Sequence, residues 1–314
     1  MFFPITTFPV AANPCGIGTQ RNVLVGGSAY QAAAWNGVNF GILFNEAAPI
    51  AQAAFSPTGL TGSWTQHNPT DPGTKLYVDM VAVSGNFVAL IQGSVTQKYV
   101  AISADQGVSW AFNGAPALGV TNWSKLVYNG AVLIAIGTNV PGWGVSGDGG
   151  VTWALVAGLP NEAWSAGAWN GNDFCVVGQN TRTTLTSPDG INWTVNLLAL
   201  PQVVPWIAIK WNGNVFCAIA TGTNVCATSP DGVVWTQQNI TNVLSYRSLL
   251  VHGTDLYAIA AGTAVTRISL NDGVTWTSCA LPLSSNWKAS TIDPVLAKAL
   301  VISSNFQVGA TIQF

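Results

Sequence analysis

The sequence predicts an all-β fold built from seven similar units, and two regularities carry this prediction. A short motif, Ser-x-Asp-x-Gly-x-Thr-Trp, recurs along the chain, and an aromatic residue opens each unit at intervals of 47, 46, 41, 42, 40 and 41 residues. The opening aromatics are Tyr30, Tyr77, Trp123, Trp164, Trp206, Tyr246 and Trp287. A period of about 40–45 residues matches one four-stranded blade of a β-propeller. We therefore expect a seven-bladed β-propeller of four-stranded antiparallel blades.

The motif is expected to form a tight turn between two strands. Its acid can accept hydrogen bonds from backbone N–H groups just ahead of it, and its glycine supplies a positive φ. Its tryptophan buries a large ring beneath the turn. We interpret these residues as structural because the same acid recurs in each unit, whereas an active site is normally unique. The alternative that the acids are catalytic or bind calcium stays open at this point.

The predicted structural residues come from five copies of the motif. They are Ser103, Asp105, Gly107, Trp110, Ser146, Asp148, Gly150, Trp153, Ser187, Asp189, Gly190, Trp193, Ser229, Asp231, Gly232, Trp235, Ser269, Asn271, Gly273 and Trp276. A sixth copy, from Ser56 to Trp64, lacks the acid.

This motif resembles the Asp-box, or BNR repeat, of sialidase-like β-propellers, including those of bacteriophage tail and capsid-associated proteins. With their flanks, the five good copies cover most of the chain. The resemblance implies that each box lies on the hairpin between the third and fourth strands of a blade. It also implies that the boxes are structural and lie away from an active face.

Each unit divides into four strands by its turn residues. The first strand ends at a turn about seven residues after the aromatic, and the turn residues are Gly37, Gly85, Gly130, Gly171, Gly213, Gly253 and Pro294. Asn-Gly, as at Asn170-Gly171, is the strongest short hairpin signal. In the fourth unit we expect strands over 164–169, 173–178, 183–186 and 192–197. No helix is predicted.

The last blade is expected to be completed by the N-terminus. Seven aromatic openings stand against six boxes, so the C-terminal blade lacks a strand. Its own strands are predicted over 288–292, 295–302 and 306–314, and residues 21–25 are the best candidate for the missing one. Such pairing closes the ring and leaves no sheet edge open. A six-bladed ring with an extra sheet is the alternative.

The predicted organisation is an extended arm over residues 1–22 and one propeller domain over residues 23–314. Prolines keep the arm extended, and its anchors are expected to be Phe2, Phe3 and Phe8. These rings are too apolar to remain in water. We expect the arm to dock on a neighbouring subunit or, failing that, across its own outer blades.

Composition limits the classes of partner. Charged residues make up 7% of the 314 residues, against about 25% in typical soluble proteins. We therefore expect partners to cover much of the surface. A net charge of -2 with scattered basic residues argues against nucleic-acid binding. No apolar run approaches the roughly 18 residues of a membrane span, and the N-terminus is a poor secretory signal, so neither membrane insertion nor signal-directed secretion is expected.

No cofactor or metal site is expected. His67 and His252 are far apart in sequence, and no Cys/His spacing resembles a zinc site. The five cysteines are odd in number, which argues against a disulfide framework. Cys175 and Cys217 occupy equivalent positions in successive units and are interpreted as core residues.

The loops opposite the motif turns form the candidate ligand or partner face, because varied loops on a rigid scaffold are where binding sites usually arise. Its residues would be Glu46, Asp71, Lys75, Lys98, Trp143, Glu162 and Arg182. The alternative is that loops are simply where charges are tolerated.

A catalytic site is not expected on that face. A sialidase would need an arginine cluster, but the chain has only four arginines, and Tyr246-Arg247 is the nearest string to the family's early Phe/Tyr-Arg-Ile-Pro motif. Other glycosidases need paired carboxylates, and convergence of Glu46, Asp71 and Glu162 cannot be shown from the sequence.

Three functions compete. The first is a non-enzymatic structural or adhesion propeller of a large assembly. Low charge and high Gly, Thr, Asn and Trp content resemble bacteriophage tail and capsid-decorating proteins, whose partners would be other virion proteins or further copies, assembled in the host cytoplasm. The second is a glycan-binding module that recognises a host surface through loop aromatics such as Trp143. The third is a glycosidase of the sialidase type.

Overall fold

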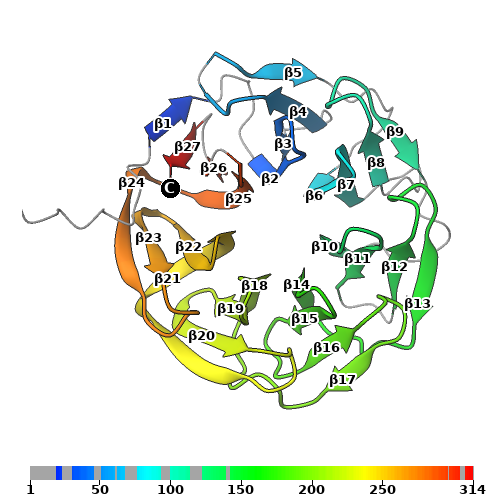
Figure 1. Cartoon of the computed structure of the whole chain (residues 1–314), viewed down its shortest axis with the longest axis vertical. Coiled ribbons are helices and arrows are strands. Elements are labelled where there is room, and N and C mark those ends of the chain that lie inside the picture. The colour runs from blue at the N-terminus through cyan, green and yellow to red at the C-terminus, as the bar shows by residue number, and fades with distance from the viewer. Residues whose placement is uncertain are drawn as a thin grey trace, which may run out of the picture.

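The computed structural model describes residues 19–22, 30–45, 51–60, 62–67, 76–92, 100–113, 122–138, 142–295, 297–304 and 308–313. These residues form a ring of antiparallel sheets (Figure 1). A cavity lined by residues of all seven inner strands lies at the centre of the ring and is called the central channel below. The first strand of each blade lies nearest the centre of the ring, and later strands lie progressively outward. The seven-bladed, all-β prediction is confirmed.

The first four blades each contain four strands in sequence order. The first has β2 (Tyr30–Trp35), β3 (Phe40–Asn45), β4 (Ala51–Ser56) and β5 (Thr65–His67). The second has β6 (Leu76–Val83), β7 (Asn86–Gln92), β8 (Val100–Ser103) and β9 (Ala111–Asn113). The third has β10 (Trp123–Tyr128), β11 (Leu133–Gly137), β12 (Gly142–Ser146) and β13 (Ala154–Ala157). The fourth has β14 (Trp164–Trp169), β15 (Phe174–Gly178), β16 (Thr184–Ser187) and β17 (Thr194–Asn196).

The fifth and sixth blades share one long strand. The fifth begins with β18 (Trp206–Trp211), β19 (Phe216–Ala220) and β20 (Thr223–Ser229), and the sixth ends with β22 (Asp255–Ala261), β23 (Thr263–Ser269) and β24 (Thr277–Ser285). Between them β21 (Thr236–His252) pairs with β20 through its first half and with β22 through its second. It therefore serves as the outer strand of one blade and the inner strand of the next.

The N-terminus closes the seventh blade, as predicted. Its strands are β25 (Trp287–Asp293), β26 (Lys298–Ser303), β27 (Val308–Gln313) and β1 (Thr19–Asn22). β1 pairs antiparallel with β27, with Thr19 opposite Thr311 and Asn22 opposite Val308. The closing strand begins two residues earlier than expected and lies inside the segment assigned to the arm. Phe2, Phe3 and Phe8 lie outside the described residues.

Each inner strand carries a β-bulge directly after its opening aromatic. A regular strand turns alternate side chains to opposite faces, whereas a bulge inserts an extra residue. In the last three blades, runs of consecutive residues line the channel, namely 207–210, 247–249 and 288–290. Each run begins at the residue directly after the opening aromatic, where the bulge lies.

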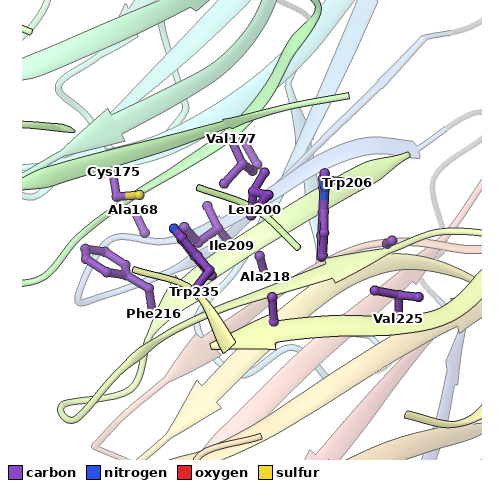
Figure 2. Packing of buried hydrophobic residues seen from close by; sticks show 13 residues of the cluster. Ala168, Cys175, Val177, Leu200, Trp206, Ile209, Phe216, Ala218, Val225 and Trp235 are labelled. Atoms are coloured by element: carbon purple, nitrogen blue, oxygen red, sulfur yellow. The ribbon is translucent and has the colours of Figure 1, made fainter. Parts of the chain in front are cut away.

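The core consists of apolar layers between neighbouring blades. Figure 2 shows the layer between the fourth and fifth blades, where Cys175 meets Phe216 and Trp235, while Trp206 packs in the same cluster. All seven opening aromatics are buried. Cys175 and Cys217 are fully buried free thiols, in agreement with their interpretation as core residues.

One cysteine departs from expectation. Cys279 of β24 is disulfide-bonded, and its partner lies outside the described residues. An odd cysteine count argues against a framework in which every cysteine pairs, but it does not exclude this single bridge, which the sequence analysis did not predict.

Candidate functional site

The Asp-box turns share the same pattern of hydrogen bonds. In the third blade, Ser146 Oγ accepts a bond from the buried Gly150 N–H at 2.8 Å and donates to Asp148 Oδ1 at 2.8 Å. Asp148 accepts bonds from the Thr152 N–H at 2.9 Å and the Thr152 hydroxyl at 2.6 Å. The Trp153 indole donates to Gly150 O at 2.9 Å. The polar side chains of Ser146, Asp148, Thr152 and Trp153 thus all have partners within the turn.

These contacts leave the box acids ionised. Hydrogen bonds from the Thr152 hydroxyl and then its N–H lower the pKa of Asp148 to about 2. The Asn192 N–H is the first cause that lowers the pKa of Asp189 to about 2. In the fifth box, Asn271 Oδ1 accepts from the Thr275 N–H at 2.9 Å, so an uncharged amide serves the same turn.

Each box also contacts the preceding blade. Gly232 has φ +77°, and a Cβ there would lie 2.8 Å from Cys175 Sγ of the fourth blade. Gly107 is still tighter, with a Cβ position 2.2 Å from the Phe55 ring of the first blade. The box glycines therefore serve the turn and the junction between blades together.

The residues of the predicted ligand face do not form one site in the part of the chain that can be described. Glu46, Asp71, Lys75 and Lys98 lie outside that part. Glu162 is half-buried, and its Oε1 accepts a bond from the Thr183 hydroxyl at 3.1 Å. Arg182 directs its Nε to Leu200 O at 2.6 Å. Both side chains tie neighbouring loops of the fourth blade together.

Trp143 was wrongly predicted to be an exposed loop aromatic. It lies in β12, is 1% exposed, and donates its indole N–H to Gly137 O at 3.1 Å. Its ring meets Trp164 and Trp193 of the fourth blade edge-on, with centroid distances of 5.8 and 4.9 Å. It fills the layer between two blades and offers no surface to a glycan.

Three arginines, Arg182, Arg247 and Arg267, have separate environments. Arg182 lies in a loop of the fourth blade and Arg247 in the inner part of β21. Arg267 is buried in β23, where it donates to Asn242 Oδ1 at 2.9 Å and to Ser278 Oγ. They come from different strand positions and have different partners, so they do not form a carboxylate-binding cluster.

A cluster of cations in the central channel was missed by the sequence analysis. Its cavity of about 150 Å³ is lined by Lys125, Lys210, Arg247 and Lys288, together with the single carboxylate of Asp79. Lys125 Nζ lies 3.4 Å from Asp79 Oδ1, and Asp79 Oδ2 accepts the Leu126 N–H at 2.9 Å. A second cavity, of about 330 Å³, shares Lys210 with the first.

The missed signal was the position of each cation relative to the opening aromatic. Arg247 and Lys288 come one residue after it, Lys125 two, and Lys210 four. Each inner strand contributes at most one cation. Aligning the seven units on their aromatics would have placed these cations on the channel wall.

The described residues contain neither a metal-binding cluster nor a membrane-spanning helix. No group of three or more His, Cys, Asp and Glu side chains there could hold a metal ion. No helix there is long and apolar enough to span a membrane.

Comparisons with known proteins support the fold. No family model and no curated protein matches the sequence. Among solved structures, YCF48 bound to D1 peptide is similar at a TM-score of 0.73 and 11% identity, covering 100% of both chains. Virginiamycin B lyase from Staphylococcus aureus has a TM-score of 0.77 and 11% identity, covering 95% of this chain and 99% of that one. YCF48 from Cyanidioschyzon merolae has a TM-score of 0.69 at 11% identity, covering 95% and 98%.

At such identities the likeness establishes architecture alone, because one fold hosts many unrelated functions. The chain is a seven-bladed β-propeller that resembles both a peptide-bound protein and a lyase in fold.

Proposed function

We propose that this protein is a non-catalytic propeller that binds partners as a structural or adhesion component of a large assembly. The observation that carries the proposal is that the acidic side chains of the Asp-boxes accept hydrogen bonds within turns. Asp105, Asp148, Asp189 and Asp231 each bind the turn of a separate blade. A glycosidase instead needs two carboxyl groups facing each other across a substrate. These four acids each serve a turn, and no two of them belong to the same blade.

The face of the ring that carries the Asp-box turns, called the box face below, supports a role in contacts with other proteins. In each of five boxes the residue after the glycine is apolar and exposed: Val108, Val151, Ile191, Val233 and Val274. Their exposed fractions run from 41% to 59%. A partner that covers this face would remove these apolar side chains from water, which favours association.

The narrower proposal is that the assembly is a bacteriophage virion, put together in the host cytoplasm. It rests on composition, since 7% charged residues would leave a free surface poor in solubilising groups. The partners would be other virion proteins or further copies of this chain. A peptide-bound propeller of the same shape, YCF48 with its D1 peptide, is consistent with a binding role.

The absence of catalysis is tested with purified protein. Sialosides and common aryl glycosides should show no turnover above that of heat-unfolded protein. Turnover that disappears in Glu162→Gln would overturn the non-catalytic assignment. Glu162 is the described glutamate of the candidate ligand or partner face, on the loops opposite the Asp-box turns.

The assembly role is tested by measuring how many copies of the protein each particle contains. In lysate of a producing host, the protein should cosediment with particles at a fixed stoichiometry that persists through a salt wash. A pair of substitutions on the box face, Val151→Lys with Val274→Lys, should reduce incorporation. The outer-strand variant Leu155→Lys, at a side chain that is 50% exposed, is the matched control. Equal incorporation of all three proteins would contradict a docking role for the box face.

A further inference from the structure

The central channel concentrates positive charge in a chain that has little charge of any kind. Lys125, Lys210, Arg247 and Lys288 are four of its 10 basic residues, and they line one cavity. They come from four different inner strands, namely β10, β18, β21 and β25. Among the described residues that line this cavity, Asp79 is the only acid.

Asp79 does not neutralise the cluster. Its two oxygens are already engaged, one by Lys125 Nζ at 3.4 Å and the other by the Leu126 N–H at 2.9 Å. Lys288 donates to the uncharged Gln31 Oε1. Within the part of the chain that the structure describes, the other three cations of the lining have no carboxylate partner, and four cations against one acid give this lining a net positive charge.

The four cations are close enough to influence one another. Desolvation lowers the pKa of Lys210, and Lys125 lowers it further against the opposing effect of Asp79. Desolvation also lowers the pKa of Lys288, with added repulsion from Lys125 and Arg247. Clefts lined by charge of one sign and walled by protein focus their field on an ion that enters.

We propose that the channel binds an oxyanion that carries two or more negative charges, through carboxylate or phosphate groups. Arg247 offers a planar guanidinium that matches such groups in two-point contact, and Lys288 and Lys125 add point charges. Ser248 and Ser290, whose hydroxyls lie 2.5 Å apart, supply uncharged hydrogen-bonding groups beside Arg247 and Lys288. A cavity of about 150 Å³ admits a small free anion or the acidic side chains of an inserted segment.

The inference does not depend on the proposed assembly role. It concerns the centre of the ring, whereas the assembly proposal concerns the turns of the box face. A propeller that never joins a particle could still bind anions in its channel, and failure of either experiment leaves the other informative.

The test is isothermal titration calorimetry of the full chain at low ionic strength, with inorganic pyrophosphate and tricarballylate as probes. At least one probe should bind with a stoichiometry of one, and added sodium chloride should weaken binding by screening. Pyrophosphate alone would identify the phosphate chemistry, and tricarballylate alone the carboxylate chemistry. No binding of either probe at millimolar concentration would overturn the proposal.

The variant Arg247→Gln and the variant Lys288→Gln should each reduce the association constant at least about tenfold, because each removes a charge-assisted contact. Lys298→Gln is the matched control, since Lys298 lies on β26 outside the cavity lining. A loss in Lys298→Gln equal to that in the channel variants would show non-specific charge attraction and refute the site.

A gain of binding gives a second test that a folding defect cannot imitate. Asp79→Asn removes the acid of the lining while keeping an oxygen that can accept the Leu126 N–H. This variant should bind the probe severalfold more tightly than the natural chain. Unchanged or weaker binding by folded Asp79→Asn would contradict electrostatic attraction by the channel.

Discussion

The Thr184 hydroxyl donates a hydrogen bond to Gly232 O at 2.8 Å, which joins the fourth blade to the Asp-box of the fifth. The same carbonyl accepts the Trp235 indole N–H at 2.9 Å, and Cys175 Sγ lies 3.9 Å away. One box carbonyl therefore holds its own turn and the neighbouring blade. The box is a junction between blades as well as a hairpin turn.

Replacing Gly232 by alanine should destabilise the ring through this junction. The substitution strains a backbone at φ +77° and forces a Cβ to 2.8 Å from Cys175 Sγ and 3.0 Å from Thr186 Cγ2. We expect the free energy of unfolding to fall by about 2–4 kcal/mol, from overpacking and the positive φ together. Urea unfolding followed by tryptophan fluorescence measures the change.

Gly222→Ala separates the two causes, because Gly222 has φ +69° with nothing within 4 Å of the Cβ position. It should cost only the backbone term of about 1–2 kcal/mol. Equal losses in the two variants would mean that contact with the fourth blade contributes nothing.

Within a box, the serine should matter more than the acid. Ser146 Oγ satisfies the buried Gly150 N–H, whereas Asp148 satisfies N–H groups at the exposed edge of the turn, where water can replace it. Ser146→Ala should cost about 1–3 kcal/mol and Asp148→Ala about 1 kcal/mol in urea unfolding. Neither should change the affinity of folded protein for a ligand. The reverse order of costs, or loss of binding without loss of stability in Asp148→Ala, would contradict a structural role for the acid.

Stability should fall in acid through the boxes. The pKa values of Asp148 and Asp189 are lowered to about 2, and those of Asp105 and Asp231 are also lowered. A lowered acid pKa stabilises the fold above the unfolded value of about 3.9, and this contribution disappears as pH falls through the folded value. The free energy of unfolding should therefore decline between about pH 4 and pH 2.

The fifth box supplies the control for this acid dependence. Asn271 occupies the position of the acid and does not titrate, so Asn271→Asp should steepen the decline and Asp148→Asn should flatten it. Thermal unfolding at several pH values in this range checks both slopes. Identical slopes in all three proteins would place the acid sensitivity outside the boxes.

The architecture could be predicted from the sequence because the same short-range sequence signals recur in each blade. Aromatic openings, Asn-Gly turns and box tryptophans act within one unit, and seven copies reinforce one another. The closing strand lies two residues earlier than predicted. It pairs with β27 at the far end of the chain, so its register depends on a partner that is distant in sequence.

Features that depend on neighbouring blades could not be read in this way. Trp143 follows a proline and two glycines flank it, which favours a loop, yet Trp164 and Trp193 bury it from the next blade. The channel cations lie at one, two and four residues after their aromatics. Bulges bring both residues after the aromatic to the channel, so simple strand alternation would not place them together.

Desolvation in the channel should make the charge of Lys210 unfavourable for stability at neutral pH. Lys210 is exposed to the channel, but surrounding protein and Lys125 lower its pKa below the unfolded value. Between those two values the unfolded chain binds more protons than the folded chain, so stability rises with pH across that window. Lys210→Met keeps most of the apolar stem and removes the charge. It should be more stable than the natural chain at neutral pH, by a small margin because channel water screens the charges.

The pH dependence distinguishes removal of an unfavourable charge from improved packing. The advantage of Lys210→Met over the natural chain should shrink as pH rises toward 10.5, because the natural Lys210 loses its charge there first in the folded state. Taking the difference between the two proteins cancels the titration of other groups, and Lys298→Met controls for loss of a lysine outside the channel. A Lys210→Met variant less stable than the natural chain at neutral pH, or an advantage that does not change with pH, would show that the charge of Lys210 does not oppose folding.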